Sequence, residues 1–282
     1  MSGQHRSAEN SNAVTFVFCT LLLLVVGQAS AQQWPLHFPE PSPDVVRVLK
    51  DIRFATTDTI SLLMDVYRPN VASAGSPALI FYTLYWPAEG ASLRESDWYK
   101  SWARIAAANG IVAIVPDLRA EPGTGNATTP VRASGDDFQR LVAHLTKHAS
   151  EYGVDPARIA VYAASGAAWA ALPAVEDTMQ SAIKAAVIYY GSADIQSFRR
   201  DLPLLWIRAG LDSERTNSAI ARASSLALSQ NAPVTLLNHP TGRHAFEGRD
   251  NNAATRAIIE QTLAFVKYAT MPDFQAAIRQ RS

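Results

Sequence analysis

The sequence predicts an α/β fold with a mostly parallel central sheet that is covered by helices on both faces. From residue 77 onward, short apolar stretches of strand length alternate with longer stretches of helical periodicity. This alternation is typical of parallel strands joined by crossover helices. The chain has 282 residues, 48% of them hydrophobic, which suits one large core. We therefore expect a single domain over residues 32–282.

The individual elements follow from local patterns. Residues 45–55 and 60–67 cluster β-forming side chains around a turn-like Thr-Thr-Asp-Thr segment, which predicts an antiparallel strand pair at the start of the sheet. The later strands are expected at residues 78–83, 111–115, 159–163, 185–190, 204–208 and 234–237. The helices are expected at residues 97–108, 136–152, 166–174, 217–230 and 253–269. About eight strands result.

Helical stripes and breaker residues mark where these elements end. In the helix expected at 136–152, Phe138, Leu141 and Leu145 share one face, and Gly153 ends the helix. Residues 119–135 are rich in glycine, proline and threonine and are expected to form a surface loop. The segment between the strands at 185–190 and 204–208 is too short for a helical lid.

The N-terminus has the pattern of a secretory signal peptide. Residues 13–27 are almost entirely apolar, and small residues follow at Ala29 and Ala31, as in an A-x-A cleavage site. We expect residues 1–31 to be a leader that directs export to the periplasm or the medium. The alternative is an uncleaved N-terminal anchor. Because no comparable apolar run follows, no other membrane segment is expected.

Charge and cysteine content exclude several function classes. The chain has 25 basic and 25 acidic residues without a block of like charges, which argues against nucleic-acid binding. Its one cysteine, Cys19, lies in the leader, so the mature chain has no disulfide, thiolate metal site or cysteine nucleophile. His144 and His148 have metal-ligand spacing, but no third ligand is near, which favours a solvated helix face. We expect neither a metal nor another cofactor.

The segment from Arg158 to Ala171 changes character at Ser165. Before this serine the chain reads as a buried strand, and after it a run of small residues reads as a helix. A serine on such a sharp turn presents its hydroxyl above the sheet edge as a nucleophile. The turn needs small residues on both sides, and Ala163 and Ala167 meet that need. The alternative is a serine that caps a helix.

Two other residues at strand ends complete a catalytic set. Asp212 follows the strand at 204–208, and His244 follows the strand at 234–237. Ligands of parallel sheets bind beyond the carboxyl ends of the strands, where all three residues would meet. A serine hydroxyl needs an imidazole to accept its proton, and a carboxylate must orient that imidazole.

Each partner has an alternative. Asp212 could instead cap the next helix, in which case Glu214 is the nearest substitute acid. His239 competes with the proposed histidine, although its position before a proline suits a structural role. Asp117, also at a strand end, is expected to form a structural pair with Arg119.

The same edge supplies candidates for the other parts of an active site. The amide of Gly166 is expected to stabilise an oxyanion, and a second amide should come from Leu84 or Tyr85 in the loop after the strand at 78–83. Four aromatic side chains are candidates for an apolar pocket: Tyr82, Tyr85, Trp86 and Trp169.

Several motifs together resemble the α/β-hydrolase fold family, and more narrowly its esterase and dienelactone-hydrolase-like members. The motifs are Leu-Met-Asp-Val-Tyr-Arg-Pro at 63–69, Val-Pro-Asp-Leu-Arg at 115–119, Asp-Pro-Ala-Arg-Ile-Ala-Val-Tyr at 155–162 before Ser165, Arg-Ala-Gly-Leu-Asp at 208–212 and Arg-His-Ala-Phe at 243–246. The resemblance spans about residues 45–270. It implies hydrolysis of small carboxylic esters through an acyl-enzyme on Ser165, with His244 as base and acid and Asp212 as its orienting group. Dienelactone hydrolases use a cysteine nucleophile, so Ser165 argues against that particular activity.

Two departures from the family pattern keep other functions open. The turn reads Ala-Ala-Ser-Gly-Ala, and Thr83-Leu84-Tyr85-Trp86 stands where esterases commonly have His-Gly-Gly-Gly. One alternative is a protein of this fold that binds a ligand without turnover. Another is a peptidase or carbohydrate deacylase with the same three catalytic residues.

Overall fold

The computed structural model describes residues 34–57, 60–71, 75–86, 90–120 and 129–280. The predicted leader at 1–31 lies outside these residues. Within the described part of the chain, no helix has the length and apolar character needed to cross a bilayer.

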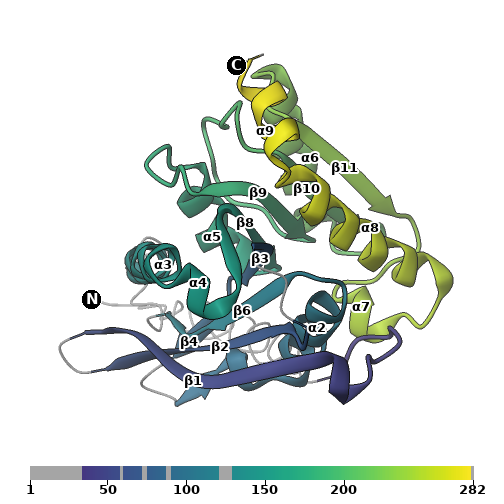
Figure 1. Cartoon of the computed structure of the whole chain (residues 1–282). Coiled ribbons are helices and arrows are strands. Elements are labelled where there is room, and N and C mark those ends of the chain that lie inside the picture. Colours follow the sequence, from purple (N-terminus) through teal and green to yellow (C-terminus); the bar gives the residue numbers. More distant parts are fainter. Residues whose placement is uncertain (1–33, 58–59, 72–74, 87–89, 121–128, 281–282) are drawn as a thin grey trace, which may run out of the picture.

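An eight-stranded sheet forms the centre of the molecule (Figure 1). Its strands, in spatial order, are β1 (Val46–Thr56), β2 (Ser61–Pro69), β6 (Val112–Pro116), β3 (Ser76–Phe81), β8 (Val154–Ala164), β9 (Ile183–Tyr189), β10 (Leu204–Ala209) and β11 (Val234–His239). The β1–β2 and β2–β6 pairs are antiparallel, and every later pair is parallel. The predicted mostly parallel sheet with an antiparallel start is therefore confirmed.

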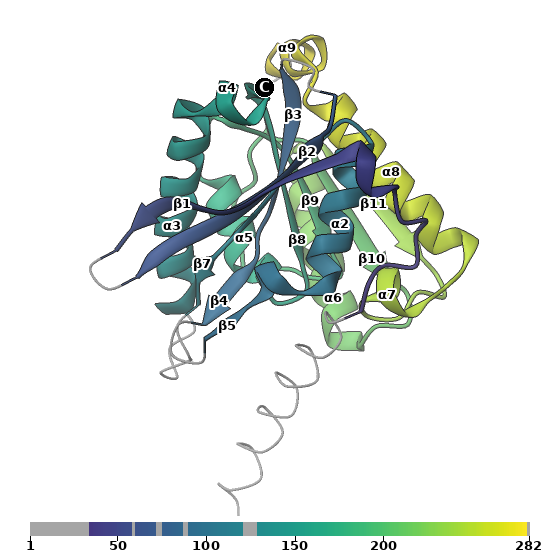
Figure 2. The same cartoon turned by 60° about the horizontal axis from the view of Figure 1, so that its bottom comes forward.

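Helices cover both faces of this sheet, because its strands bury side chains on both sides. In β3, Ile80 contributes to one apolar cluster while Leu79 and Phe81 contribute to the other. The first cluster includes residues of α3 (Thr129–Lys147), α5 (Ala167–Glu176) and α6 (Glu214–Ser229). The second includes residues of α2 (Asp97–Ala108) and α8 (Ala253–Ala269). Figure 2 shows α3 and α5 on the opposite side of the central strands from α2 and α8.

The parallel register brings the carboxyl ends of the central strands to one edge. At that edge Ala164 of β8 pairs with Tyr189 of β9, and Ala209 of β10 pairs with His239 of β11. The loops that leave β8, β10 and β11 therefore start side by side. No helix lies between β9 and β10, as the short connection predicts.

A second, small sheet occupies two segments that the sequence indicates to be loops. It consists of β4 (Leu84–Trp86) between β5 (Ala91–Ser92) and β7 (Leu118–Arg119). The surface loop predicted at 119–135 is thus wrong at both ends, since Arg119 lies in β7 and α3 begins at Thr129. These strands have two or three residues, which is too few to show a period of two.

A buried ionic cluster fixes this small sheet to the main one. The guanidinium of Arg94, in the 3-10 turn Leu93–Glu95, contacts carboxylate oxygens of Asp65 at 2.7 Å and Asp117 at 3.2 Å. Ser92 also donates a hydrogen bond to Asp117. Asp117 thus forms an ion pair, as predicted, but its partner is Arg94. The predicted partner, Arg119, binds Asp137 instead, at 2.7 Å.

Several helix boundaries differ from those predicted. α6 begins at Glu214, three residues early, because Ser213 caps it by accepting a hydrogen bond from the Thr216 amide at 3.1 Å. The helix predicted at 136–152 is interrupted at His148, and its last four residues form the separate helix α4 (Ala149–Tyr152). The helices α7 (Phe246–Arg249) and α9 (Pro272–Arg279) were not predicted.

Candidate active site

Ser165 lies on a sharp turn between β8 and α5. Its φ of 53° is in the left-handed region, which a non-glycine residue adopts only at a steric cost. The Ser165 amide donates a hydrogen bond to the Tyr189 carbonyl at 3.0 Å, which holds the turn against β9. Ala163 and Ala167 are both buried beside it. The serine is therefore held by its backbone, with its hydroxyl at the sheet edge.

Gly191 provides the space that this turn needs. A Cβ at this position would lie 2.5 Å from the Ser165 carbonyl oxygen and 2.6 Å from the Ala168 Cβ, both too close for a side chain. Gly191 is not among the site residues predicted from the sequence. The sequence feature that could have identified it is a glycine directly after the buried strand expected at 185–190, at the edge where ligands bind.

The loops that carry Asp212 and His244 are tied to each other. The Leu211 amide donates a hydrogen bond to the Gly242 carbonyl at 2.9 Å. At Gly210 the chain passes so close to Pro240 that a Cβ would lie 2.2 Å from the Pro240 carbonyl oxygen. These backbone contacts place Asp212 and His244 on adjacent turns.

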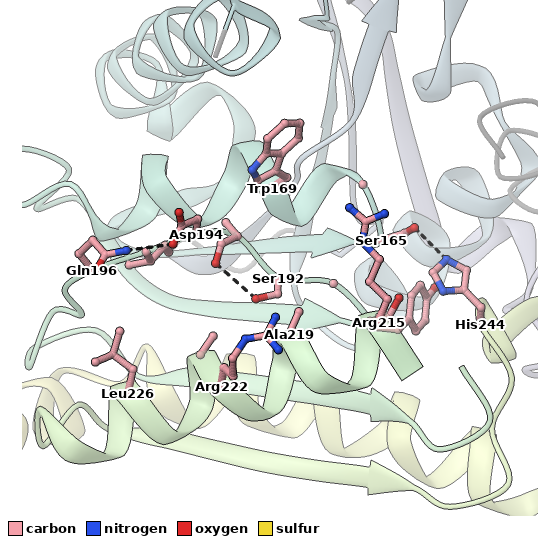
Figure 3. Close-up of a pocket in the computed structure, with 17 residues that line it drawn as sticks. Ser165, Trp169, Ser192, Asp194, Gln196, Arg215, Ala219, Arg222, Leu226 and His244 are labelled. Carbon is pink, nitrogen blue, oxygen red and sulfur yellow. Dashed lines mark hydrogen bonds between the residues drawn. The ribbon is translucent and has the colours of Figure 1, made fainter. Parts of the chain in front are cut away.

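The three predicted residues form a continuous hydrogen-bonded series. Ser165 Oγ lies 2.8 Å from His244 Nε2, and His244 Nδ1 lies 2.6 Å from Asp212 Oδ2 (Figure 3 shows the first contact). The Asp212 side chain is 6% exposed and the His244 side chain 23% exposed. The structure thus shields the carboxylate and leaves the imidazole and hydroxyl accessible to a ligand.

Neighbouring residues hold the histidine loop in place. Arg243 binds Asp250 through its amide at 2.8 Å and its Nε at 2.6 Å. Ala245 adopts a φ of 61°, which turns the chain from His244 into α7. This support could not be predicted from the sequence, because each contact depends on the tertiary position of α7.

A buried carboxyl group lies behind the histidine. The Tyr190 ring packs against the His244 ring at 4.7 Å between centroids. Its hydroxyl donates to Glu247 Oε1 at 3.1 Å, and the Tyr162 hydroxyl donates to the same oxygen at 3.1 Å. Desolvation in this fully buried place raises the pKa of Glu247 to about 8. Glu247 is therefore a neutral, hydrogen-bonded group over much of the ordinary pH range.

The alternative acid and base lie elsewhere. Glu214 is exposed in the first turn of α6, and Ser213 rather than Asp212 caps that helix. His239 is buried, with its Nε2 at 3.2 Å from Thr255 Oγ1.

The histidine pair on α3 has other partners. His144 Nε2 lies 2.9 Å from the Tyr152 hydroxyl, and His148 Nδ1 lies 2.7 Å from Glu151. The described residues contain no group of three or more side chains that could hold a metal ion.

The predicted oxyanion donors lie in different places. Gly166 is the N-cap of α5 and lines the cavity beside Ser165, so its amide lies next to the hydroxyl. Leu84 and Tyr85 are in β4, where they pair with β7, and neither lines that cavity. The amide of Thr83, which directly precedes them, already donates a hydrogen bond to the Phe81 carbonyl at 2.8 Å.

A cavity of about 640 Å³ opens beside Ser165 and His244. Its walls come from the start of α5, from the loop after β9 and from one face of α6 (Figure 3). Trp169 lines it, as predicted for a pocket residue. Tyr82 does not, because it is fully buried and packs against Phe138 under the sheet edge. The side chain of Trp86 lies outside the described residues.

Known proteins of similar structure include esterases, although no family model and no curated protein matches the sequence. Esterase Est22, solved with p-nitrophenol, is 14% identical with a TM-score of 0.62, and the match covers 86% of this chain and 88% of that one. Esterase B from Lactobacillus rhamnosis, inhibited by a tributyrin phosphonate, is 11% identical with a TM-score of 0.67 over 94% and 97% of the two chains. Thermogutta terrifontis esterase 2, phosphoramylated by tabun, is 17% identical with a TM-score of 0.57 over 80% and 95%. The strand order, the turn at Ser165 and these matches together identify the chain as a protein of the α/β-hydrolase fold.

Proposed function

We propose that this protein is a serine hydrolase that cleaves small carboxylic esters through an acyl-enzyme on Ser165. The observation that carries the proposal is the series from Ser165 Oγ through His244 to Asp212, with separations of 2.8 Å and 2.6 Å. Both lie within the range in which a general base activates a hydroxyl. The similarity of the fold to esterases supports the same reaction. A serine nucleophile also favours ester hydrolysis over the dienelactone activity.

The geometry accounts for both halves of the reaction. Ser165 Oγ attacks the ester carbonyl carbon while its proton moves to His244 Nε2, and Asp212 stabilises the imidazolium through Nδ1. The Gly166 amide, at the N-terminus of α5, favours the negative charge on the carbonyl oxygen. When the tetrahedral adduct collapses, the carbon–oxygen bond to the alcohol breaks and His244 returns the proton to that alcohol. Water then repeats the sequence at the acyl-enzyme, which releases the acid and restores the serine.

The test is hydrolysis of p-nitrophenyl acetate and butyrate by the full chain and by Ser165→Ala. We expect release of p-nitrophenol by the unaltered protein and a loss of at least about a thousandfold in the variant. A fluorophosphonate should label the unaltered protein covalently at Ser165, as measured by the mass of the tryptic peptide. Equal rates in both proteins, or no adduct, would remove Ser165 from the mechanism and favour a binding protein without turnover.

We further propose that the protein is exported, with residues 1–31 as a cleaved leader. The support is the apolar run at 13–27 followed by Ala29 and Ala31. N-terminal sequencing of protein recovered from the periplasm or medium should begin near Gln32. Recovery of the uncleaved chain in the membrane fraction would favour the N-terminal anchor.

A further inference from the structure

Two arginines of α6 line the cavity beside the candidate catalytic residues. Arg215 and Arg222 are seven residues apart, which places them on one face of the helix two turns from each other. Figure 3 shows both guanidinium groups directed into the cavity, with that of Arg215 directed toward Ser165. The spacing corresponds to about 10 Å along the helix axis. Two positive charges therefore lie along the path from the nucleophile into the cavity.

Neither guanidinium is neutralised by a carboxylate of the described residues. No side-chain hydrogen bond or ion pair within the described residues involves Arg215 or Arg222, whereas the Arg243 and Arg119 side chains bind Asp250 and Asp137. One carboxylate also lines the cavity, that of Asp194, and its Oδ1 accepts a hydrogen bond from Gln196 at 2.9 Å.

The position of Arg215 is also unfavourable for the helix itself. It lies in the first turn of α6, where the positive end of the helix dipole disfavours a cation. The first turn of α6 therefore adds its positive end to the two guanidinium groups at the same cavity wall.

We propose that the ester substrate carries a negatively charged oxyacid group, a carboxylate or a phosphate, which Arg215 and Arg222 bind. This inference rests on the proposed ester hydrolysis and names its substrate class. Guanidinium groups bind such anions with two parallel hydrogen bonds. The anionic group lies on the α6 side of the scissile carbonyl, since Arg215 is directed toward Ser165 and Arg222 is two turns farther along α6. Apolar side chains between the arginines and beyond them, including Ala219 and Leu226, contact the carbon chain.

The experiment compares matched anionic and neutral esters. For the acyl side the pair is mono-p-nitrophenyl glutarate and p-nitrophenyl valerate, and for the alcohol side it is 4-acetoxybenzoate and its methyl ester. Each pair is measured with the full chain and with Arg215→Gln, Arg222→Gln and Arg256→Gln. Arg256 is the matched control, because it lies on α8, outside the cavity, and binds Asn251.

We expect the anionic ester of at least one pair to have the higher kcat/KM. The anionic-to-neutral ratio should fall about tenfold in Arg215→Gln and in Arg222→Gln, and it should not change in Arg256→Gln. The same ratio should decrease as the ionic strength is raised from about 0.02 M to about 0.5 M, because exposed charges are screened. Inhibition of butyrate ester hydrolysis by glutarate or by inorganic phosphate then distinguishes the two oxyacid groups.

A binding measurement separates failure of this inference from failure of the proposed reaction. Calorimetric titration of Ser165→Ala with glutarate and with inorganic phosphate needs no turnover. Binding of at least one anion, weakened in the double variants that also carry Arg215→Gln or Arg222→Gln, supports the anion site even if no ester is cleaved. If neither anion binds and neither pair shows a preference, the inference is overturned while ester hydrolysis stands. An equal change in Arg256→Gln would also overturn it, because the effect would then come from overall charge.

Discussion

At the scale of single residues, the site depends on which carboxylate faces the histidine. Asp212 and Glu214 are two residues apart, but one ends a loop after β10 and the other begins α6. Only Asp212 reaches the imidazole, at 2.6 Å. The choice between them is set by Ser213, because its capping of α6 turns Glu214 outward into solvent.

Replacement of this acid should reduce the rate without unfolding the protein. We expect Asp212→Asn to lower kcat on p-nitrophenyl butyrate by about a thousandfold to ten-thousandfold, because an amide favours the wrong histidine tautomer. Glu214→Gln, two residues away, is the matched control and should change kcat less than about twofold. Steady-state kinetics with circular dichroism of each variant measures both quantities. Comparable losses of kcat in both variants would show that Asp212 is not the specific partner of His244.

Glu247 should make the stability of the protein depend on pH. Its pKa of about 8 in the folded chain lies above the ordinary glutamate value of 4.5, so the folded state holds a proton that the unfolded state releases between these values. The free energy of unfolding therefore falls as the pH rises from about 4.5 to about 8, by a few kcal/mol. Glu247→Gln stays neutral and should remove this part of the pH dependence.

Urea denaturation at about pH 5 and about pH 8.5 measures the effect. The difference between the two midpoints should be smaller in Glu247→Gln than in the unaltered protein. Glu260→Gln, at an exposed position of α8, is the control and should keep the full difference. An unchanged difference in Glu247→Gln would show that another group causes the pH dependence.

At the scale of elements, the turn between β8 and α5 depends on the loop after β9. Gly191 lies so close to the Ser165 backbone that a methyl group would meet it at 2.5 Å. Ser165 is thus positioned by a segment that is separate from it in the sequence.

We expect Gly191→Ala to displace the turn and lower kcat on p-nitrophenyl butyrate by at least about a hundredfold, since small misplacements of a reacting group have large effects on rate. Gly135→Ala in α3 is the matched control, because nothing lies within 4 Å of a Cβ there. It should leave kcat unchanged and stabilise the chain by about 0.5–1 kcal/mol through higher helix propensity. Steady-state rates on p-nitrophenyl butyrate and thermal unfolding of each variant measure these two effects. Full activity in Gly191→Ala would show that the loop can move away.

At the scale of the whole molecule, the described residues leave the cavity open beside Ser165. The connection from β9 to β10 forms one of its walls and contains no helix. A short, partly charged cavity of about 640 Å³ suits small substrates better than long acyl chains.

The protein should therefore act on dissolved esters without activation at an oil interface. We expect kcat/KM to fall from p-nitrophenyl butyrate to p-nitrophenyl decanoate. We also expect the rate on tributyrin to saturate smoothly as its concentration passes the solubility limit. A sharp rise of the tributyrin rate at that limit would contradict this expectation and indicate a lid that opens at the interface.

The sequence by itself determined the main sheet and the three catalytic candidates. Long apolar strands and amphipathic helices have periods that are visible locally, so β3, β6, β9, β10 and β11 begin and end within two residues of their predicted limits. β8 also ends as predicted but begins five residues earlier, at Val154. Ser165, Asp212 and His244 could be predicted because each follows a strand whose carboxyl end lies at the ligand-binding edge.

Tertiary structure alone decided the features that depend on contacts between distant segments. The strands β4, β5 and β7 are too short to show a period, and Arg94 acquires Asp65 and Asp117 as partners only when three elements meet. Tyr82, an aromatic residue at a strand end, turned out to be core. The presence of both Arg215 and Arg222 on one cavity wall likewise depends on where α6 packs in the fold. A local pattern reports the period of one segment, whereas a site is made by the distances between segments.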